Sequence, residues 1–454
     1  MNPDIFRQYD IRGVVDVDLT GPVVHDLGRA LGTCARQSGA ATFAVGRDCR
    51  THSPAMWKAL VTGLVSTGLE VVDLGVVPTP LLYFGVVTLE LGGGVMITGS
   101  HNPPPFNGFK MMIGGDTIHG DAIQALRRMM ETEAFGVCGS GTVSRFNVVD
   151  RYVDFVAADV RRGGRRLKVV VDAGNGVGAI AALPLLERLN VEVVPLFFEP
   201  DGTFPNHHPD PSELETLETL IATVRREGAD LGIAYDGDAD RIGVVDDRGE
   251  VVFGDHLLCL LARDVLADSP GATIIGEVKC SQTLFDDIAA HGGVPMMWKV
   301  GHSLIKARMK ETGAALAGEM SGHIFFAHRY LGFDDAIYTT ARLLELLAHQ
   351  PLPLSRLLET VPRLHATPEL RVEVGEREKF AIARAVAEVF AVDHEVVTID
   401  GVRVLFDDGW GLIRASNTQP VLVLRAEGTT VERRDAIVAL LYEAVGQAQR
   451  TVRG

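Results

Sequence analysis

The amino-acid sequence predicts an α/β protein: three consecutive α/β domains with mixed sheets, followed by a smaller C-terminal α+β domain. Two observations lead to this prediction. Strand-like and helix-like segments alternate in three successive units, and this order changes after Pro362. The length of 454 residues is enough for about three domains, and four are possible.

Each of the three units contains a strand, a helix and a second strand. In the first unit, Pro54 stands at the start of the helix and Gly68 at its end, which are the positions that these residues favour. Such units form parallel or mixed sheets covered by helices. The expected segments are 41–45, 54–67 and 69–74; then 167–172, a helix to 189 and 191–198; then 272–278, a helix to 290 and 294–299.

The C-terminal part has a different order: a strand, a helix, a group of strands and a final helix. The expected helices span 376–390 and the chain from about 431, and the expected strands span 395–406, 410–415 and 420–426. Thr429 or Thr430 is suited to cap the final helix, with Glu432 in its first turn. We expect domains at 1–145, 146–254, 255–365 and 366–454, packed on one another because no low-complexity linker separates them.

Composition and charge narrow the range of partners. The net charge of −16 argues against nucleic acid and anionic membrane surfaces, although a local basic pocket can still bind a phosphate ligand. Five scattered cysteines without a CxxC pair fit a reducing compartment better than a disulfide framework. The N-terminus has no apolar signal region, and charges or glycines interrupt every long apolar stretch. We therefore expect a cytoplasmic protein.

The segment Thr98-Gly-Ser-His-Asn-Pro-Pro-Pro-Phe-Asn-Gly-Phe-Lys110 presents a hydroxyl at the end of a strand. The apolar run Val95-Met-Ile predicts a buried strand, and the prolines and asparagines that follow prevent a helix or ladder from continuing. Ser100 then lies on a stiff turn, with His101 and Lys110 close by in sequence. This is how a nucleophile is presented; a proline-rich surface turn with an incidental serine is the alternative.

A second segment, Tyr235-Asp-Gly-Asp-Ala-Asp-Arg241, lies between two apolar runs and predicts an acidic turn between strands. Asp236, Asp238 and Asp240 repel one another unless a cation lies among them, and hard oxygen ligands suit Mg²⁺ or Ca²⁺. The spacing is not that of an EF-hand, because Arg241 takes the place of the required glycine and the flanks look like strands. An acidic turn without a metal is the alternative.

Two further loops have chemically versatile side chains. Gly318-Glu-Met-Ser-Gly-His323 places Glu319 and Ser321, which are suited to hydrogen-bond sugar hydroxyls, between glycines that let a backbone approach a ligand. Arg414-Ala-Ser-Asn-Thr-Gln-Pro420 combines a guanidinium, two hydroxyls and an amide side chain with nearby backbone N–H groups, which suits a phosphate. Either loop taken alone is equally compatible with an ordinary polar turn.

Taken together, the four loops resemble those of the α-D-phosphohexomutase superfamily, and within it the bacterial phosphomannomutase/phosphoglucomutase branch. The resemblance covers essentially the whole chain, with the loops in the family's order and at similar separations. It also includes Phe6-Arg-Gln-Tyr-Asp-Ile-Arg-Gly13, Val45-Gly-Arg-Asp48, Gly75-Val-Val-Pro-Thr-Pro80, Val171-Asp-Ala-Gly-Asn-Gly176, Phe204-Pro-Asn-His-His-Pro-Asp-Pro211 and Lys299-Val-Gly-His-Ser303.

The resemblance implies four domains around a central cleft, each contributing one loop. It implies that Ser100 carries a phosphoryl group and binds Mg²⁺ with Asp236, Asp238 and Asp240, and that a hexose 1,6-bisphosphate acts as activator. It also implies a set of substrate-binding residues: Glu319 and Ser321 at the 3- and 4-hydroxyls of the sugar, Arg414, Ser416, Asn417 and Thr418 at the phosphate that is not transferred, and Tyr9, Arg12, Lys279, His302 and His323 elsewhere in the cleft. We expect hexose phosphates as substrates and a monomeric enzyme.

The same loops make physical sense for phosphoryl transfer, which needs charge neutralisation and in-line geometry. Mg²⁺ and Arg241 supply positive charge at the reacting end, and a distant anion clamp orients the substrate. Phospho-Ser100 gives its group to C1 or C6 of a hexose phosphate, and the 1,6-bisphosphate turns over and returns the other group. Lys110, His101 and His323 are candidates for the base, and the sequence does not rank them.

Two other classes of enzyme are alternatives to a phosphohexomutase. Lys168-Val-Val-Val-Asp-Ala-Gly-Asn-Gly-Val-Gly-Ala179, with Glu199 after the next strand, has the pattern of a dinucleotide-binding loop, but Asp172 would face the pyrophosphate. A metal-dependent phosphatase that uses Ser100 is the second alternative.

Glucose and mannose differ only at C2, so the sequence does not choose between them. Ser416-Asn417-Thr418 resembles the phosphomannomutase/phosphoglucomutase branch more than the phosphoglucosamine branch, where Ser-Gly-Thr is usual.

Overall fold

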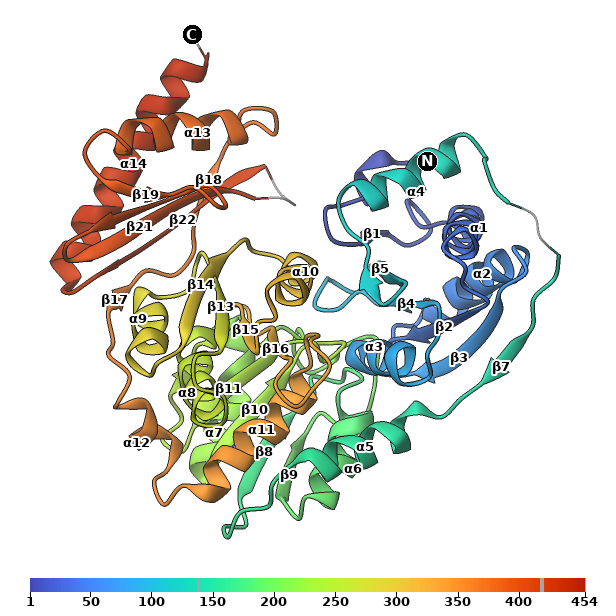
Figure 1. Ribbon diagram of the computed structural model, residues 1–454, viewed down its shortest axis with the longest axis horizontal. Helices are drawn as coiled ribbons and strands as arrows, with labels where there is room; N and C mark the ends of the chain where they lie inside the picture. Colours follow the sequence, from blue (N-terminus) through green and yellow to red (C-terminus); the bar gives the residue numbers. More distant parts are fainter. Residues whose placement is uncertain (137–138, 417–419, 454) are drawn as a thin grey trace.

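The computed structural model describes residues 1–136, 139–416 and 420–453, which form four sheets that follow one another along the chain (Figure 1). The first three sheets mix parallel and antiparallel strands, and the fourth is antiparallel. The expected fold class is therefore confirmed. Within the described part of the chain, no helix combines the length and the apolar character needed to cross a membrane.

The first sheet has the strand order β1-β5-β4-β2-β3-β7, with β6 beside β5. Its parallel strands β4 and β2 are neighbours, so Ile97 and Arg47 pair at the same carboxyl edge, and the loops that follow both strands meet there. The elements are η1 (Pro3–Ile5), β1 (Ile11–Val14), α1 (Gly21–Gln37), β2 (Thr42–Arg47), α2 (Ser53–Val65), β3 (Glu70–Val76), α3 (Thr79–Thr88), β4 (Gly93–Ile97), β5 (Phe106–Ile113), β6 (Asp116–Thr117), α4 (Asp121–Glu131) and β7 (Val143–Arg145).

The second sheet has the order β12-β11-β10-β8-β9. Strands β8, β9 and β10 are parallel and fully or largely apolar, whereas β10 and β11 form an antiparallel hairpin in which Tyr235 pairs with Ile242. The acidic segment 236–241 is the turn of this hairpin, as expected. The elements are α5 (Val148–Asp159), β8 (Lys168–Asp172), α6 (Ala179–Arg188), β9 (Glu192–Leu196), η2 (Leu214–Leu217), α7 (Glu218–Glu227), β10 (Leu231–Tyr235), β11 (Ile242–Asp246) and β12 (Val251–Val252).

The third sheet has the order β14-β13-β15-β16, with β13 parallel to both neighbours and β16 antiparallel to β15. The β15–β16 turn is the segment that contains Glu319 and His323. The elements are α8 (Gly254–Asp268), β13 (Thr273–Glu277), α9 (Gln282–Ala290), β14 (Val294–Trp298), α10 (His302–Thr312), β15 (Leu316–Gly318), β16 (Ile324–Phe326), α11 (Ala336–His349) and α12 (Leu354–Leu358).

The fourth sheet has the order β17-β22-β21-β20-β19, with β18 also on β22, and is covered by two helices. The single strand expected at 395–406 is wrong: Gly401 adopts a left-handed φ of 80°, and the chain turns back so that β19 and β20 pair as a hairpin. Thr430 caps the last helix by accepting from the Arg433 N–H. The elements are β17 (His365–Ala366), β18 (Leu370–Glu373), α13 (Lys379–Phe390), β19 (Glu395–Val397), β20 (Val402–Phe406), β21 (Gly409–Ala415), β22 (Val421–Gly428) and α14 (Val431–Arg453).

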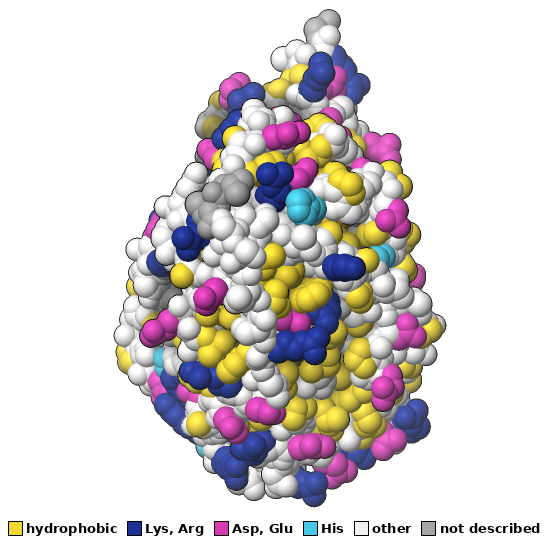
Figure 2. Space-filling model, turned by 90° about the vertical axis from the view of Figure 1, so that its right-hand side faces the viewer, with side chains coloured by type: hydrophobic (Ala, Val, Ile, Leu, Met, Phe, Trp, Pro, Cys, Tyr) yellow, Lys and Arg dark blue, Asp and Glu magenta, His cyan; other side chains and the backbone are white. Residues whose placement is uncertain are grey.

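The apolar cores divide the molecule unequally. One continuous cluster includes Leu82 of the first sheet region, Val171 of the second and Leu316 of the third, so these three units share buried surface. The fourth sheet has a separate core, and its apolar contact with the third unit is a small cluster around Val278 and Trp410. Acidic and basic side chains are interspersed on the face shown in Figure 2, without a large area of one sign.

Candidate active site

Ser100 lies in the loop that follows β4 and is buried. Its backbone has a left-handed φ of 48°, which costs a residue other than glycine about 1–2 kcal/mol. The Thr98 hydroxyl accepts the Ser100 N–H at 2.8 Å and helps to hold this conformation. The loop therefore keeps the Ser100 hydroxyl in one direction, toward the second unit.

Arg50 holds the same loop from the other side, and the sequence analysis gave it no role. Its guanidinium is buried and donates to a series of loop carbonyls: those of Ser100 (2.9 Å), Asn102 (2.5 Å), Pro103 (2.9 Å) and Phe106 (3.0 Å). Asp48, at the end of β2, accepts the Gly99 N–H at 2.9 Å. A side chain on Gly99 would collide with the Arg50 guanidinium, so glycine is required there.

The acidic hairpin turn lies directly against the Ser100 loop. The Ser100 hydroxyl donates to Oδ2 of Asp236 at 2.6 Å, and the other oxygen of Asp236 accepts the backbone N–H groups of Asp240 and Arg241 at 3.1 Å. The approach of the two loops is so close that a Cβ on Gly237 would lie 2.5 Å from the Ser100 carbonyl oxygen. The structure thus joins the expected nucleophile to the expected metal ligands.

Lys110 and Thr79 complete the surroundings of the aspartates. The Lys110 ammonium donates to Oδ2 of Asp238 at 2.7 Å and to Oδ2 of Asp240, and the Thr79 hydroxyl donates to Asp238 at 2.5 Å. The Oδ1 atoms of Asp238 and Asp240 are buried and have no hydrogen-bond partner among the described residues. Unsatisfied carboxylate oxygens in a cluster whose ligand atoms lie within 4.8 Å of one another fit a hard divalent cation such as Mg²⁺.

The charges of this cluster control its pKa values. Burial and the charges of Asp238 and Asp240 raise the pKa of Asp236 well above its usual range. Burial alone would raise the pKa of Asp238, but the adjacent Lys110 ammonium lowers it. Burial likewise opposes the charged form of Lys110, but Asp238 and Asp240 raise its pKa. The site therefore holds an ionised Asp238 beside a firmly protonated lysine, whereas the charged form of Asp236 is unfavourable without a further cation.

His101 and Arg12 lie next to Ser100. The Nδ1 atom of His101 is 3.1 Å from the Ser100 hydroxyl, and burial together with the charge of Arg241 lowers the pKa of His101 well below its usual range. Arg12 donates to the Gly99 carbonyl at 2.5 Å and to Asp10 at 2.7 Å. The ring of His101 is therefore neutral, and the guanidinium of Arg12 lies at the backbone of the Ser100 loop.

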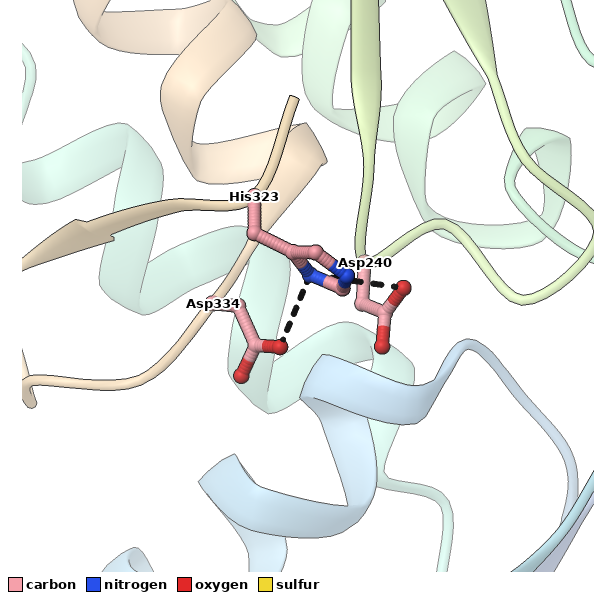
Figure 3. A group of neighbouring side chains, drawn as sticks. All are labelled: Asp240, His323 and Asp334. Atoms are coloured by element: carbon pink, nitrogen blue, oxygen red, sulfur yellow. Dashed lines mark ion pairs between the residues drawn. The ribbon is translucent and has the colours of Figure 1, made fainter. Parts of the chain in front are cut away.

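The β15–β16 turn approaches the acidic turn through His323. The Nε atom of Arg241 donates to Nε2 of His323 at 3.0 Å, while Nδ1 of His323 lies 3.0 Å from Asp334 and 3.8 Å from Asp240 (Figure 3). His302 stacks on His323 with the ring centres 5.5 Å apart. Asp334 was not identified from the sequence.

Glu319 and Ser321, in the same turn, differ in their contacts. Glu319 is buried, and its Oε1 accepts the Gly301 N–H at 2.7 Å. Ser321 is half-buried and lines a small cavity of about 30 Å³ with Ile242 and Gly254. Only Glu319 is joined by a hydrogen bond to the segment that precedes His302.

The segment 299–303 connects three of the four units. Its Val300 carbonyl accepts the Tyr9 hydroxyl at 2.8 Å, and its Val300 N–H donates to Asp400 of the fourth sheet region at 3.1 Å. Arg414 donates to the same oxygen of Asp400 at 3.2 Å. The end of β21, at Arg414, therefore lies beside the third unit.

Lys279 also bridges the third and fourth units, by an ion pair of 2.6 Å with Glu369. Ser416 is buried, and its N–H donates to the Val421 carbonyl at 3.0 Å. Asn417 and Thr418 lie outside the described residues, so their expected contact with phosphate stays a prediction.

The comparisons with known proteins agree with this arrangement. Four models of the phosphoglucomutase/phosphomannomutase family match consecutive parts of the chain: alpha/beta/alpha domain I at residues 3–136, domain II at 150–249, domain III at 253–364 and the C-terminal domain at 369–444.

Individual relatives match over nearly the full length. A phosphomannomutase/phosphoglucomutase of Pseudomonas aeruginosa is 49% identical over 95% of this chain and 93% of its own, and a phosphoglucomutase of Neisseria gonorrhoeae is 47% identical over 94% and 93%. A crystal structure of a phosphoglucomutase/phosphomannomutase family protein from Burkholderia thailandensis has a TM-score of 0.94 at 44% identity, over 99% of this chain and 98% of that one. Because the four domain models match in order along the chain and these relatives match over nearly its full length, the chain belongs to the phosphoglucomutase/phosphomannomutase family.

Proposed function

We propose that this enzyme interconverts the 1-phosphate and 6-phosphate of a hexose, mannose and/or glucose, through a phosphoserine at Ser100 and a hexose 1,6-bisphosphate. The observation that carries the proposal is the buried contact of 2.6 Å between the Ser100 hydroxyl and Asp236, within a cluster of carboxylates and basic side chains. A serine in such surroundings suits transfer of a highly charged group rather than acyl chemistry, because the charge of that group must be neutralised.

Asp236, Asp238 and Asp240 hold Mg²⁺ in this proposal, together with an oxygen of phosphorylated Ser100. When bound, the ion neutralises negative charge on the phosphoryl oxygens. Lys110, which donates to Asp238 and Asp240, and Arg241, whose backbone N–H donates to Asp236, contribute further positive charge. Preorganised charges of this kind stabilise the transition state without the cost of reorganising water.

Among the candidate bases, the geometry favours His323 for the sugar hydroxyl. Lys110 is a poor acceptor because two carboxylates keep it protonated. His101 is neutral but lies on the serine oxygen itself, which suits exchange of a proton with Ser100. His323 belongs to the turn that carries the sugar-binding Glu319, and its Nε2 lone pair accepts a hydrogen bond. A donor hydroxyl of the substrate suits the same lone pair.

Two phosphate sites make the enzyme a mutase. Arg414 and Ser416, with Asn417 and Thr418, bind the phosphate that is not transferred, while Ser100 exchanges the other. Glu319 and Ser321 bind the 3- and 4-hydroxyls, and Tyr9, Arg12, Lys279 and His302 line the remaining path. Hexose 1,6-bisphosphate activates the enzyme because it phosphorylates Ser100. The enzyme acts as a monomer, which light scattering checks.

The dinucleotide-binding alternative fits this structure less well. In the loop after β8, Asp172 lies 3.1 Å from the imidazole Nε2 of His207, and a Cβ on Gly176 would lie 2.7 Å from the Gly237 carbonyl. The glycines thus permit contact between loops of the same chain, and the carboxylate at the turn repels a pyrophosphate.

The test is turnover of mannose 1-phosphate, glucose 1-phosphate and glucosamine 1-phosphate, followed by ³¹P NMR. We expect 6-phosphates from the first two sugars, a slower reaction with the third, and dependence on added hexose 1,6-bisphosphate. Release of inorganic phosphate without a 6-phosphate would instead identify a phosphatase. Reaction of glucosamine 1-phosphate alone would place the enzyme in a different branch of the superfamily.

A further inference from the structure

Three buried ligand-type atoms converge behind the β15–β16 turn: Nδ1 of His323, Oδ2 of Asp334 and Oδ1 of Asp240 (Figure 3). None of the three makes a regular hydrogen bond with the described residues. We propose that Asp334 is a positioning residue that keeps the proton of the neutral form of His323 on Nδ1, so that the lone pair of Nε2, which accepts from Arg241 in this structure, can accept from the substrate hydroxyl instead. This inference rests on the base role proposed above for His323.

The tautomer follows from the contact on the opposite side of the ring. Arg241 has only donor groups, so its Nε–H, 3.0 Å from Nε2 of His323, requires a lone pair on that nitrogen. The proton of a neutral ring then lies on Nδ1, which is 3.0 Å from Asp334. The hydrogen bond made by one imidazole nitrogen determines the state of the other.

Asp334 is itself held in a fixed and ionised state. Its Oδ1 accepts the Lys306 ammonium at 2.7 Å, and its carboxylate is completely buried. Burial alone would raise the pKa of Asp334, but Lys306 and His323 keep it well below its usual range. The next residue, Asp335, serves a different purpose, because it caps α11 by accepting the Tyr338 N–H.

A second metal ion at these three atoms is the other explanation of their convergence. The surroundings oppose it, because Lys306 already pairs with Asp334, Lys110 with Asp240, and Arg241 lies on His323. A divalent cation would meet three positive groups on the ligands themselves. A proton on Nδ1 of His323 that faces Asp334 adds no further positive charge to the neutral ring.

Asp334→Asn is the informative substitution because Lys306 controls how the amide is oriented. The ammonium only donates, so it takes the amide oxygen and leaves the NH₂ group facing Nδ1 of His323. If Asp334 rather than Arg241 decides the tautomer, Nδ1 then accepts, the ring proton moves to Nε2, and Arg241 gives up its contact with that nitrogen. The general shape of the site is kept, while the acceptor needed for catalysis is removed.

The experiment measures the tautomer of His323 together with the kcat and KM of the enzyme. In protein labelled with ¹⁵N-histidine, with the His323 signals identified by their loss in His323→Gln, we expect the Nδ1–H form in the wild type and the Nε2–H form in Asp334→Asn. A positioned base contributes about 10²–10⁴-fold, so kcat should fall by about 10²-fold or more. KM should change by less than about threefold, because no substrate contact is lost.

Two further variants separate this role from a structural one. In the His323→Gln background, Asp334→Asn should cause little additional loss of kcat, since both changes remove the same function. Asp335→Asn is the matched control: burial raises the pKa of Asp335 to about 6, its carboxylate is equally buried, and it faces Tyr152 and Tyr330 instead of the site. Its kcat should stay at the wild-type value.

An unchanged His323 tautomer in Asp334→Asn would overturn the inference, and so would a loss of kcat that persists undiminished in the His323→Gln background. Zn²⁺ bound with a stoichiometry that Asp334→Asn abolishes would replace it by a metal site. If the wild-type chain does not interconvert hexose phosphates, the proposed function fails, while the tautomer comparison still decides the role of Asp334.

Discussion

Ser100 is the residue on which the proposed chemistry depends, and its position combines two unfavourable features. Its backbone is left-handed, and its hydroxyl is buried beside an acidic cluster. Strained residues of this kind persist when the surrounding structure determines them, and they are frequent at active sites. Here the surroundings are the Arg50 guanidinium and the Thr98 hydroxyl.

Ser100→Ala should abolish mutase turnover, by about 10³-fold or more, because no other group takes the phosphoryl. Intact-mass spectra of the wild type incubated with hexose 1,6-bisphosphate should show up to one phosphate per chain, and spectra of the variant none. A phosphate on another residue, or an active alanine variant, would contradict the assignment.

The aspartate cluster should make the enzyme dependent on a divalent cation. Chelation should remove activity and Mg²⁺ should restore it, because the carboxylates alone repel a phosphate. Asp238→Asn should weaken both Mg²⁺ binding, measured by calorimetry, and turnover. Wild-type rates in excess chelator would show that Asp236, Asp238 and Asp240 serve another purpose.

The loop between β4 and β5 shows how a segment without regular hydrogen bonds obtains a fixed shape. Its carbonyls converge on one guanidinium, so a single side chain replaces the ladder that the prolines exclude. Arg50 comes from the loop after β2, which is brought there because β2 and β4 are parallel neighbours. The sheet thus sets the position of Ser100 through Arg50.

Arg50→Lys should lower kcat by about 10-fold or more, because one ammonium cannot reach carbonyls in several directions and small misplacements of a reacting group are costly. KM should change little, since Arg50 is buried under the loop, and the thermal midpoint should fall. The matched control is Arg47→Lys, in which the replaced residue pairs with Asp73 outside the site. Equal effects of both substitutions would deny Arg50 this role.

The division of the cores suggests how the molecule moves. The first three units share one apolar cluster, whereas the fourth has its own and contacts the third through a small apolar cluster and polar bridges. In Figure 1 the fourth sheet, in red, lies beside β13 and β14. Units joined by limited interfaces move relative to one another by default. The fourth unit is therefore the expected clamp for a substrate that must turn over.

Arg414→Ala should raise KM and release more 1,6-bisphosphate, because in the proposed mechanism the guanidinium binds the phosphate that is away from Ser100 and so favours the closed state. Phosphorylation of Ser100 should survive. The measurements are KM, released bisphosphate and phosphoserine content, with Arg433→Ala as a control from the same unit, where Arg433 pairs with Asp408. Unchanged binding together with unchanged retention of bisphosphate would exclude the clamp.

The alternation of strands and helices, and the four loops, could be predicted from short stretches of sequence. Asp236, Asp238 and Asp240 lie within five positions, in a tight turn between two apolar strands. A turn this short brings their side chains close together. The position of Ser100 in the turn that follows a strand could likewise be predicted from the local sequence. The hairpin of β19 and β20 was missed because the apolar pattern on both sides of Gly401 resembles one strand.

Contacts between distant segments could not be found in this way. Arg50, Thr79 and Asp334 contact the site across 50, 159 and 11 positions, to Ser100, Asp238 and His323 respectively. Local pattern determines which element forms, because periodicity and turn residues act over a few positions. The packing of the sheets determines which buried basic side chain contacts which carboxylate, and which nitrogen of His323 faces Asp334. Packing is a property of the folded chain.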